Sequence, residues 1–258
     1  MGVPWYEEAF RHDYLLVYPH RNEEQAKLEV EFALRVCGFR QPSKILDLCC
    51  GYGRHSSLLA KKGFQVVGCD LSPELLKCFA ERLDGLPAKP RIVRGDARKL
   101  PFLAAEFGAV FSFFQSFGYF ESPVEDGHMV EEIGRVLRPD GCFLLDLMNP
   151  DFALKHLEPV SVSAAAGMKM VQRRRYDAVR GKIIKTITVS IRDREEKSWC
   201  EEVRLYRKET LEELFRANHL EAVEWFGDFD GRPFSPETPR MIALARKKLP
   251  SGAESFSP

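Results

Sequence analysis

The chain has 258 residues, and its 38 basic and 38 acidic side chains leave no formal net charge. Hydrophobic residues make up 45% of it, which excludes disorder as the main state and predicts a sizeable core. The balanced charge disfavours a general nucleic-acid binder, since such proteins usually carry a basic excess that displaces counterions from phosphates. No apolar run is long enough to cross a bilayer and no signal-peptide pattern is present, so we expect a cytoplasmic location.

The first half of the chain has the pattern of a parallel sheet covered by helices on both faces. An aromatic N-terminal segment precedes an amphipathic helix from Glu23 to Val36, and Gly38 ends that helix. After Pro42, short apolar strands alternate with helical stretches. The expected strands are Lys44 to Cys49, Gln65 to Asp70, Arg91 to Arg94, Ala109 to Phe114 and Cys142 to Leu147; the expected helices run to Lys62, from Ser72 to Leu83 and from Val124 to Leu137.

The alternation of strands and helices then stops, and an antiparallel meander is predicted. Its three strands are Lys169 to Tyr176, Lys182 to Ile191 and Ser198 to Tyr206, separated by polar turn-like clusters. In the middle strand Ile183, Ile187, Val189 and Ile191 recur at period two, as in a half-buried strand. A capping box at Thr210 to Glu213 should open another helix, and strands at Ala222 to Phe229 and Met241 to Ala245 bring the main sheet to seven.

The seven cysteines show neither the spacing of a zinc site nor that of a disulfide framework. We therefore expect reduced thiols packed in the core, and no metal site.

A glycine loop between a strand and a helix, Asp47-Leu-Cys-Cys-Gly51-Tyr-Gly53, indicates a ligand site at the helix N-terminus. Asp70 ends the next strand, 19 residues after Gly51, where a carboxylate can accept hydrogen bonds from ribose hydroxyls. Asp47 separates the candidate ligands. Two unit charges about 4 Å apart interact by roughly 4 kcal/mol at an effective dielectric of 20, so a carboxylate here would repel the pyrophosphate of NAD and attract the ammonium and sulfonium of S-adenosylmethionine.

On these motifs, together with Gly95-Asp-Ala97 and Val136-Leu-Arg-Pro-Asp-Gly141, the sequence resembles class I S-adenosylmethionine-dependent methyltransferases. The resemblance agrees with a Rossmann-like, doubly wound, mostly parallel seven-stranded sheet carrying an antiparallel β insert. It implies these cofactor contacts: Gly51 and Gly53 at the methionyl part, Asp47 near its amino group, Asp70 on the ribose, Leu71 on adenine, and Asp96 and Ala97 at the adenine edge. The family usually has glycine where this chain has Cys49.

Further residues are candidate contacts of the cofactor and the substrate. Arg54 is a candidate partner of the methionyl carboxylate, and Gln115, Tyr18 and Arg21 complete the expected cofactor contacts, the last two from a lid ahead of the first long helix. Tyr119 and His20 are the candidates for taking or relaying a proton. Tyr119, Asp228 and Arg240 are the candidate substrate contacts.

The expected organisation places an N-terminal lid and helix at 1–40, the cofactor-binding core at 41–150, a β insert covering the substrate side at 151–208, the C-terminal helix and antiparallel strands at 209–248, and a disordered tail at 249–258.

The expected activity is methyl transfer to an N or O atom of a small molecule, because the insert resembles that of small-molecule methyltransferases, including amino-sugar N-methyltransferases. Three alternatives stay open: an RNA methyltransferase, a non-catalytic adenosyl-ligand-binding protein and a nicotinamide oxidoreductase. We expect neither a membrane nor a nucleic-acid partner, and the protein should be a monomer or a homodimer.

Overall fold

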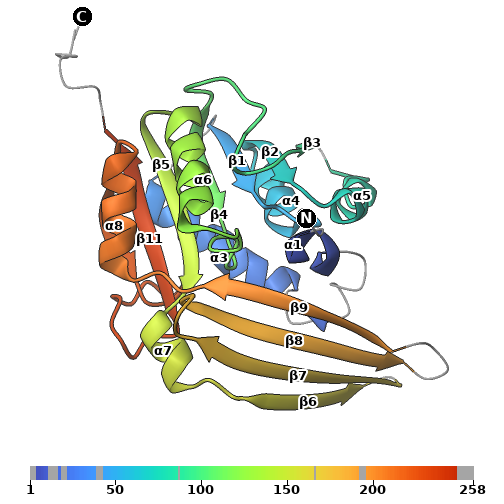
Figure 1. The fold of residues 1–258 in the computed structure, drawn as a ribbon. Coiled ribbons are helices and arrows are strands. Elements are labelled where there is room, and N and C mark those ends of the chain that lie inside the picture. The colour runs from blue at the N-terminus through green and yellow to red at the C-terminus, as the bar shows by residue number, and fades with distance from the viewer. Residues whose placement is uncertain are drawn as a thin grey trace, which may run out of the picture.

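The structure is a computed structural model, and it describes residues 4–10, 17–18, 22–38, 43–86, 88–165, 167–191 and 196–248. Its main sheet has seven strands in the order β10-β11-β5-β4-β1-β2-β3 (Figure 1). The strands are β1 (Lys44–Leu48), β2 (Gln65–Asp70), β3 (Arg91–Arg94), β4 (Phe107–Ser112), β5 (Leu137–Met148), β10 (Leu220–Phe226) and β11 (Arg240–Lys247). Neighbouring strands from β3 to β5 are parallel, and β11 is antiparallel to both β5 and β10. The predicted Rossmann-like fold class is thus confirmed.

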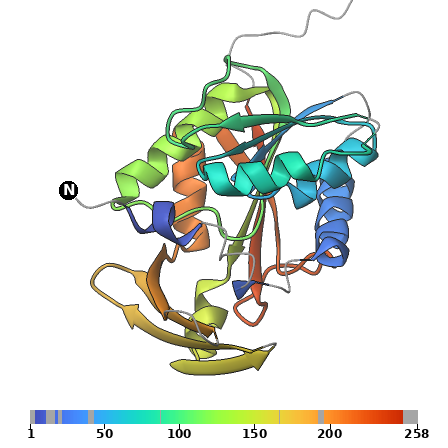
Figure 2. The ribbon, with the colours of Figure 1, turned by 90° about the vertical axis from the view of Figure 1, so that its right-hand side faces the viewer.

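Successive residues of the central strands enter two different cores, as a sheet covered on both faces requires. Ile45 and Ala109 pack in the core with α3 (Glu23–Cys37) and α4 (Arg54–Lys61), whereas their neighbours Leu46 and Val110 pack in the core with α6 (Pro123–Val136) and α8 (Lys208–Ala217). Figure 2 shows α3 on one side of the sheet and α6 and α8 on the other. The helix α5 (Pro73–Glu81) begins at the predicted cap, where the Ser72 hydroxyl accepts the Leu75 N–H.

The insert is a separate four-stranded antiparallel sheet in the order β6-β7-β8-β9. Its strands are β6 (Val160–Ala165), β7 (Met168–Asp177), β8 (Lys182–Ile191) and β9 (Lys197–Arg204), and the short helix α7 (Pro150–Lys155) leads into it (Figure 1). The meander was predicted with three strands, so β6 corrects that prediction. Ile183, Ile187 and Val189 are buried on one face of β8, as predicted.

The N-terminal helix α1 (Trp5–Ala9) packs beside β9, and the buried Val17 joins a small core with Met170, Ile187 and Val189 of the insert. The insert therefore supports the N-terminal segment directly.

The predicted capping box at Thr210 to Glu213 was wrong. Helix α8 begins at Lys208 after Arg207, which makes no side-chain cap, so Thr210 lies inside the helix and cannot cap it. The capping box instead opens α6, where Ser122 and Glu125 exchange side-chain and backbone hydrogen bonds.

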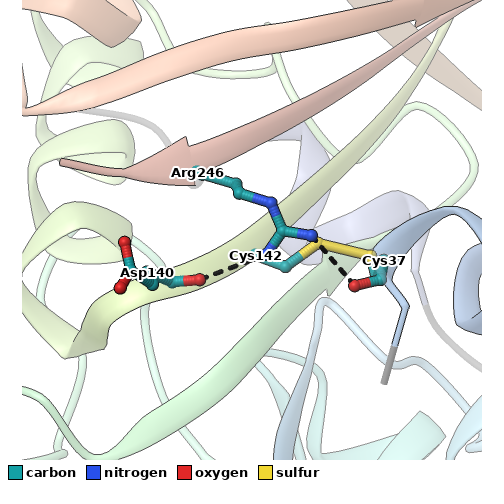
Figure 3. Close-up of a disulfide and its surroundings, with 4 residues drawn as sticks. All are labelled: Cys37, Asp140, Cys142 and Arg246. Atoms are coloured by element: carbon teal, nitrogen blue, oxygen red, sulfur yellow. Dashed lines mark hydrogen bonds between the residues drawn. A yellow bond between two sulfur atoms is a disulfide. The ribbon is translucent and has the colours of Figure 1, made fainter.

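The expectation of free thiols is also corrected, because a disulfide joins Cys37 to Cys142 (Figure 3). It links the end of α3 to β5 across 105 residues of sequence, a span that contains β1 to β4. Arg246 of β11 lies beside the bond and donates to the Cys37 and Asp140 carbonyl oxygens at 3.0 and 3.2 Å. The disulfide and Arg246 together fasten α3 to the sheet. Cys49, Cys50, Cys69, Cys78 and Cys200 form no disulfide among the described residues.

No helix in the described ranges is both long enough and apolar enough to cross a membrane.

Candidate active site

A cavity of about 280 Å³ opens at the carboxyl ends of β1, β2 and β4 and beside the segment after β3. This is the edge of a parallel sheet at which doubly wound folds bind ligands. Its lining includes the strand-end acids and the glycine loop: Asp47, Cys49, Gly51, Asp70, Leu71, Asp96 and Ala97. It also includes Tyr6, Glu7 and Phe10 from the N-terminal segment and Tyr119 and Phe120 from the loop after β4. The sheet thus brings together side chains that the sequence separates widely.

Asp47 ends β1 almost without solvent contact, with an exposed fraction of 1%. The Ser56 hydroxyl donates to its Oδ2 at 2.5 Å. Burial raises the pKa of Asp47, although His55, Ser56 and Arg54 act in the opposite direction. A buried carboxylate whose charge is poorly balanced is suited to a cationic ligand.

Asp70 fixes the glycine loop to the next strand. Its Oδ2 accepts the Gly51 N–H at 2.8 Å, and its Oδ1 accepts the Ser72 N–H at 2.9 Å. Burial raises the pKa of Asp70, and these two hydrogen bonds offset part of the effect. Each carboxylate oxygen can accept a further hydrogen bond, so Asp70 can serve both the loop and a ligand hydroxyl.

Asp96 is held by a neighbouring arginine. Arg98 Nη2 lies 2.7 Å from Asp96 Oδ2. Burial would raise the pKa of Asp96, but the hydrogen bonds from Arg98 outweigh it and lower the pKa. Arg98 also pairs with Glu125 at 2.5 Å and lies over the Phe120 ring, so the segment after β3 is tied to α6 and to the cavity wall.

Arg54, the candidate partner of the methionyl carboxylate, and His55 open α4. Their exposed fractions are only 5% and 4%, and both line the cavity. Glu29 of α3 lies 3.2 Å from Arg54 Nη2 and 2.5 Å from His55 Nε2. Nη1 of Arg54 is buried and has no hydrogen-bond partner among the described residues. Such a donor is costly unless a ligand satisfies it, and a carboxylate is the group that guanidinium binds best.

The backbone of the loop explains its glycine pattern. Gly53 has φ +75°, and a Cβ there would lie 2.0 Å from the Phe79 ring. Gly53 therefore serves the packing of α5 on the loop and is outside the cavity lining that the described residues form. Cys49, where the resembling family has glycine, has φ 58°, a conformation that costs a side-chain-bearing residue free energy.

Four other predicted residues also lie outside that lining and have contacts elsewhere. The Gln115 amide donates to the Phe117 carbonyl and accepts the Met148 N–H, and the Tyr18 hydroxyl donates to Glu201 at 2.6 Å. Arg240 pairs with Asp146 at 2.5 Å, and Asp228 accepts the Phe229 N–H. A ligand role for these residues stays a prediction.

His20 and Arg21 lie outside the described residues. Tyr119 does line the cavity, between Phe10, with ring centroids 5.6 Å apart, and Trp5, at 5.0 Å.

Sequence reasoning missed the cavity roles of His55, Tyr6 and Glu7. The position of His55 next to Arg54 was the available signal for the first. None of the described residues of β6 to β9 lines the cavity, and the covering role of the insert stays a prediction.

Comparison with known proteins agrees with this geometry. Residues 45–141 match the family model described as a methyltransferase domain. The putative methyltransferase YqeM of Bacillus subtilis is 32% identical over 124 residues, which are 48% of this chain and 49% of that protein. The 2-phytyl-1,4-naphtoquinone methyltransferase of Synechococcus elongatus is 30% identical over 178 residues, 62% of this chain and 74% of that protein. The chain belongs to the S-adenosylmethionine-dependent methyltransferase family.

This methyltransferase-family chain matches about half the length of the first curated relatives. Among solved structures, the S-adenosylmethionine-bound amino pentose methyltransferase CalS10 from Micromonospora echinaspora shares its fold with a TM-score of 0.67 at 20% identity, over 91% of this chain and 96% of that one.

Proposed function

We propose that this member of the family transfers a methyl group from S-adenosylmethionine to an N or O atom of a small molecule. The observation that carries the proposal is the cavity itself, which is lined by the buried Asp47, the half-buried Asp70 and Arg54 with its unpartnered Nη1. When bound, the cofactor supplies a methyl group already activated by a positive sulfur. The chain then has to bind it, align the acceptor and exclude water.

The residues present fit the cofactor group by group. Arg54 would hold the methionyl carboxylate through Nη1, Asp47 would face the ammonium, and Asp70 would accept from the ribose hydroxyls. At the other end of the cavity, Leu71, Asp96 and Ala97 would contact adenine. The ammonium and carboxylate of the cofactor would thus each meet a side chain of opposite charge. The buried Nη1 of Arg54 would gain a hydrogen-bond acceptor.

A small acceptor is supported by the residues that close the cavity. Aromatic side chains from the N-terminal segment and from the loop after β4, among them Phe10 and Tyr119, line this cavity of about 280 Å³, a volume suited to small ligands. Related proteins named for an amino pentose and for a naphthoquinone also act on small molecules. Tyr119 is the described candidate for relaying a proton from the acceptor.

The proposal is tested by incubating the protein with S-adenosylmethionine labelled in the methyl group and panels of small amines, phenols and carboxylic acids. We expect label in one class of product, and its loss in Arg54→Met, with Arg35→Met, an α3 surface variant, as the control. Label transfer to RNA with no small molecule methylated would favour the RNA alternative. Cofactor binding without any transfer would favour a binding protein.

Cofactor affinity should fall as the pH is lowered, because protons compete with the cationic ligand for Asp47 and Asp70. Burial raises the pKa of both groups, so the decline should begin at higher pH than for an exposed aspartate, and affinity should level off once the pH lies above the raised values. Calorimetric titrations across neutral and acidic buffers measure this. Asp47→Asn should flatten part of the dependence; an unchanged profile in that variant would contradict the assignment.

A further inference from the structure

The last residue of β9, Arg204, reaches from the insert to the loop that forms one wall of the cavity. Its backbone N–H donates to the Gly118 carbonyl at 2.8 Å, and its Nη2 donates to the Glu121 carbonyl at 2.8 Å. Nη2 also lies 3.4 Å from the Phe120 carbonyl oxygen. One arginine therefore holds residues 118–121 from both ends. Tyr119 and Phe120, which lie between those ends, line the cavity.

Arg204 is itself fixed by a buried acid. Asp126, in the first turn of α6, has an exposed fraction of 0%, and its Oδ2 lies 3.1 Å from Arg204 Nε. The Tyr206 hydroxyl donates to the same oxygen at 2.7 Å. Because Arg204 uses Nε for Asp126 and Nη2 for the loop, the planar guanidinium sets the distance between α6 and the loop.

The backbone at Gly118 shows how closely the loop follows β9. Gly118 has φ +84°, and a Cβ there would lie 2.6 Å from the Arg204 carbonyl oxygen. A side chain at that position would push the two segments apart. The loop conformation thus depends on the end of β9 through both the backbone and the Arg204 side chain.

We propose that Arg204 is a positioning residue that couples the insert to cofactor binding by holding Tyr119 and Phe120 in the cavity wall. The inference rests on the proposed function, in that the cavity is taken to bind S-adenosylmethionine. It gives the β6–β9 sheet a role even though none of its described residues lines the cavity. Helix α1 also contacts this wall, because Trp5 Nε1 donates to the Tyr119 carbonyl at 3.3 Å.

The test separates positioning from stability by using Arg204→Lys. Lysine keeps a positive charge for the buried Asp126, but it lacks the second arm that reaches the loop carbonyls. We expect the variant to stay folded without denaturant, although the lost hydrogen bonds lower its unfolding midpoint, and the folded variant to bind S-adenosylhomocysteine about tenfold more weakly in calorimetry. Arg175→Lys, an exposed β7 position, is the matched control and should change neither measurement.

A double-mutant cycle tests whether Arg204 affects cofactor binding through Tyr119 and Phe120. If Arg204 acts through the wall, Arg204→Lys should weaken binding no further in a Phe120→Ala, Tyr119→Ala background. Equal affinity of the parent protein and Arg204→Lys, or additive losses in the cycle, would overturn the inference. If Arg204→Lys folds poorly, Asp126→Asn with Arg204→Gln removes both buried charges and gives the same comparison. Failure of the parent protein itself to bind S-adenosylhomocysteine would instead refute the proposed function.

Discussion

Replacing Asp70 with alanine is expected to weaken S-adenosylhomocysteine binding on the order of 100-fold or more, since hydrogen bonds to a charged group contribute about 1.5–3 kcal/mol each. The carboxylate is the proposed acceptor for the ribose hydroxyls. It also accepts the Gly51 and Ser72 N–H groups, so its loss loosens the glycine loop as well. Calorimetry gives the affinity, and circular dichroism shows whether the variant is folded.

The control for this variant is Asp84→Ala, because Asp84 is a largely exposed aspartate whose described ion pair, with Lys89 at 3.5 Å, lies on the surface. It should bind like the parent protein. A folded Asp70→Ala variant with unchanged affinity would show that the ligand does not use the end of β2.

Replacing Arg240 with methionine is expected to lower the free energy of unfolding by about 3–5 kcal/mol, because it leaves the carboxylate of Asp146 buried without its cation. The Asp146 side chain is 0% exposed, and both of its oxygens lie 2.5 Å from Arg240 nitrogens. Oδ2 also accepts the Phe114 N–H at 2.8 Å. Chemical denaturation measures the loss, and Arg232→Met, in an exposed ion pair, should show none.

The double variant Asp146→Leu, Arg240→Met separates the effect of this ion pair on stability from its effect on cofactor binding. Removing both charges should restore most of the stability, because a buried ion pair can often be replaced by apolar side chains without loss. Phe114 and Gln115 both have positive φ, at 59° and 52°, and Phe114 lines the cavity. In this variant the Phe114 N–H loses the Asp146 carboxylate as its acceptor, so cofactor affinity should be lower than in the parent protein. Full stability together with full affinity would contradict that reasoning.

The parallel core could be predicted because residues close together in the sequence determine its strands. Buried strands are short apolar runs, and the acids that end β1 and β2 follow those runs directly, so their meeting at one sheet edge follows from the strand direction. Strand β6 gave a weaker signal. Val160 and Val162 are 51% and 60% exposed, and such a strand is stabilised mainly by its pairing with β7, which the sequence does not reveal.

The remaining site residues depend on tertiary contacts that no short pattern encodes. Arg240 is a candidate substrate contact in the sequence, and the antiparallel register of β11 on β5 gives it a partner, Asp146, that the sequence does not indicate. Glu29, from a helix preceding the glycine loop, pairs with both Arg54 and His55, a contact that the sequence does not indicate. Thr210 fits a capping box by spacing alone, but the helix starts earlier at Lys208. For Arg240, Arg54 and His55 a partner distant in sequence decides the outcome.

One calorimetric experiment tests the charge preference of the cavity most directly. The intact protein is titrated with S-adenosylmethionine and, separately, with NAD at neutral pH and low salt. Binding of S-adenosylmethionine together with absent or much weaker binding of NAD is the predicted result, because buried Asp47 attracts a cation and repels a pyrophosphate. Tighter binding of NAD, or no heat of binding with S-adenosylmethionine, would contradict it.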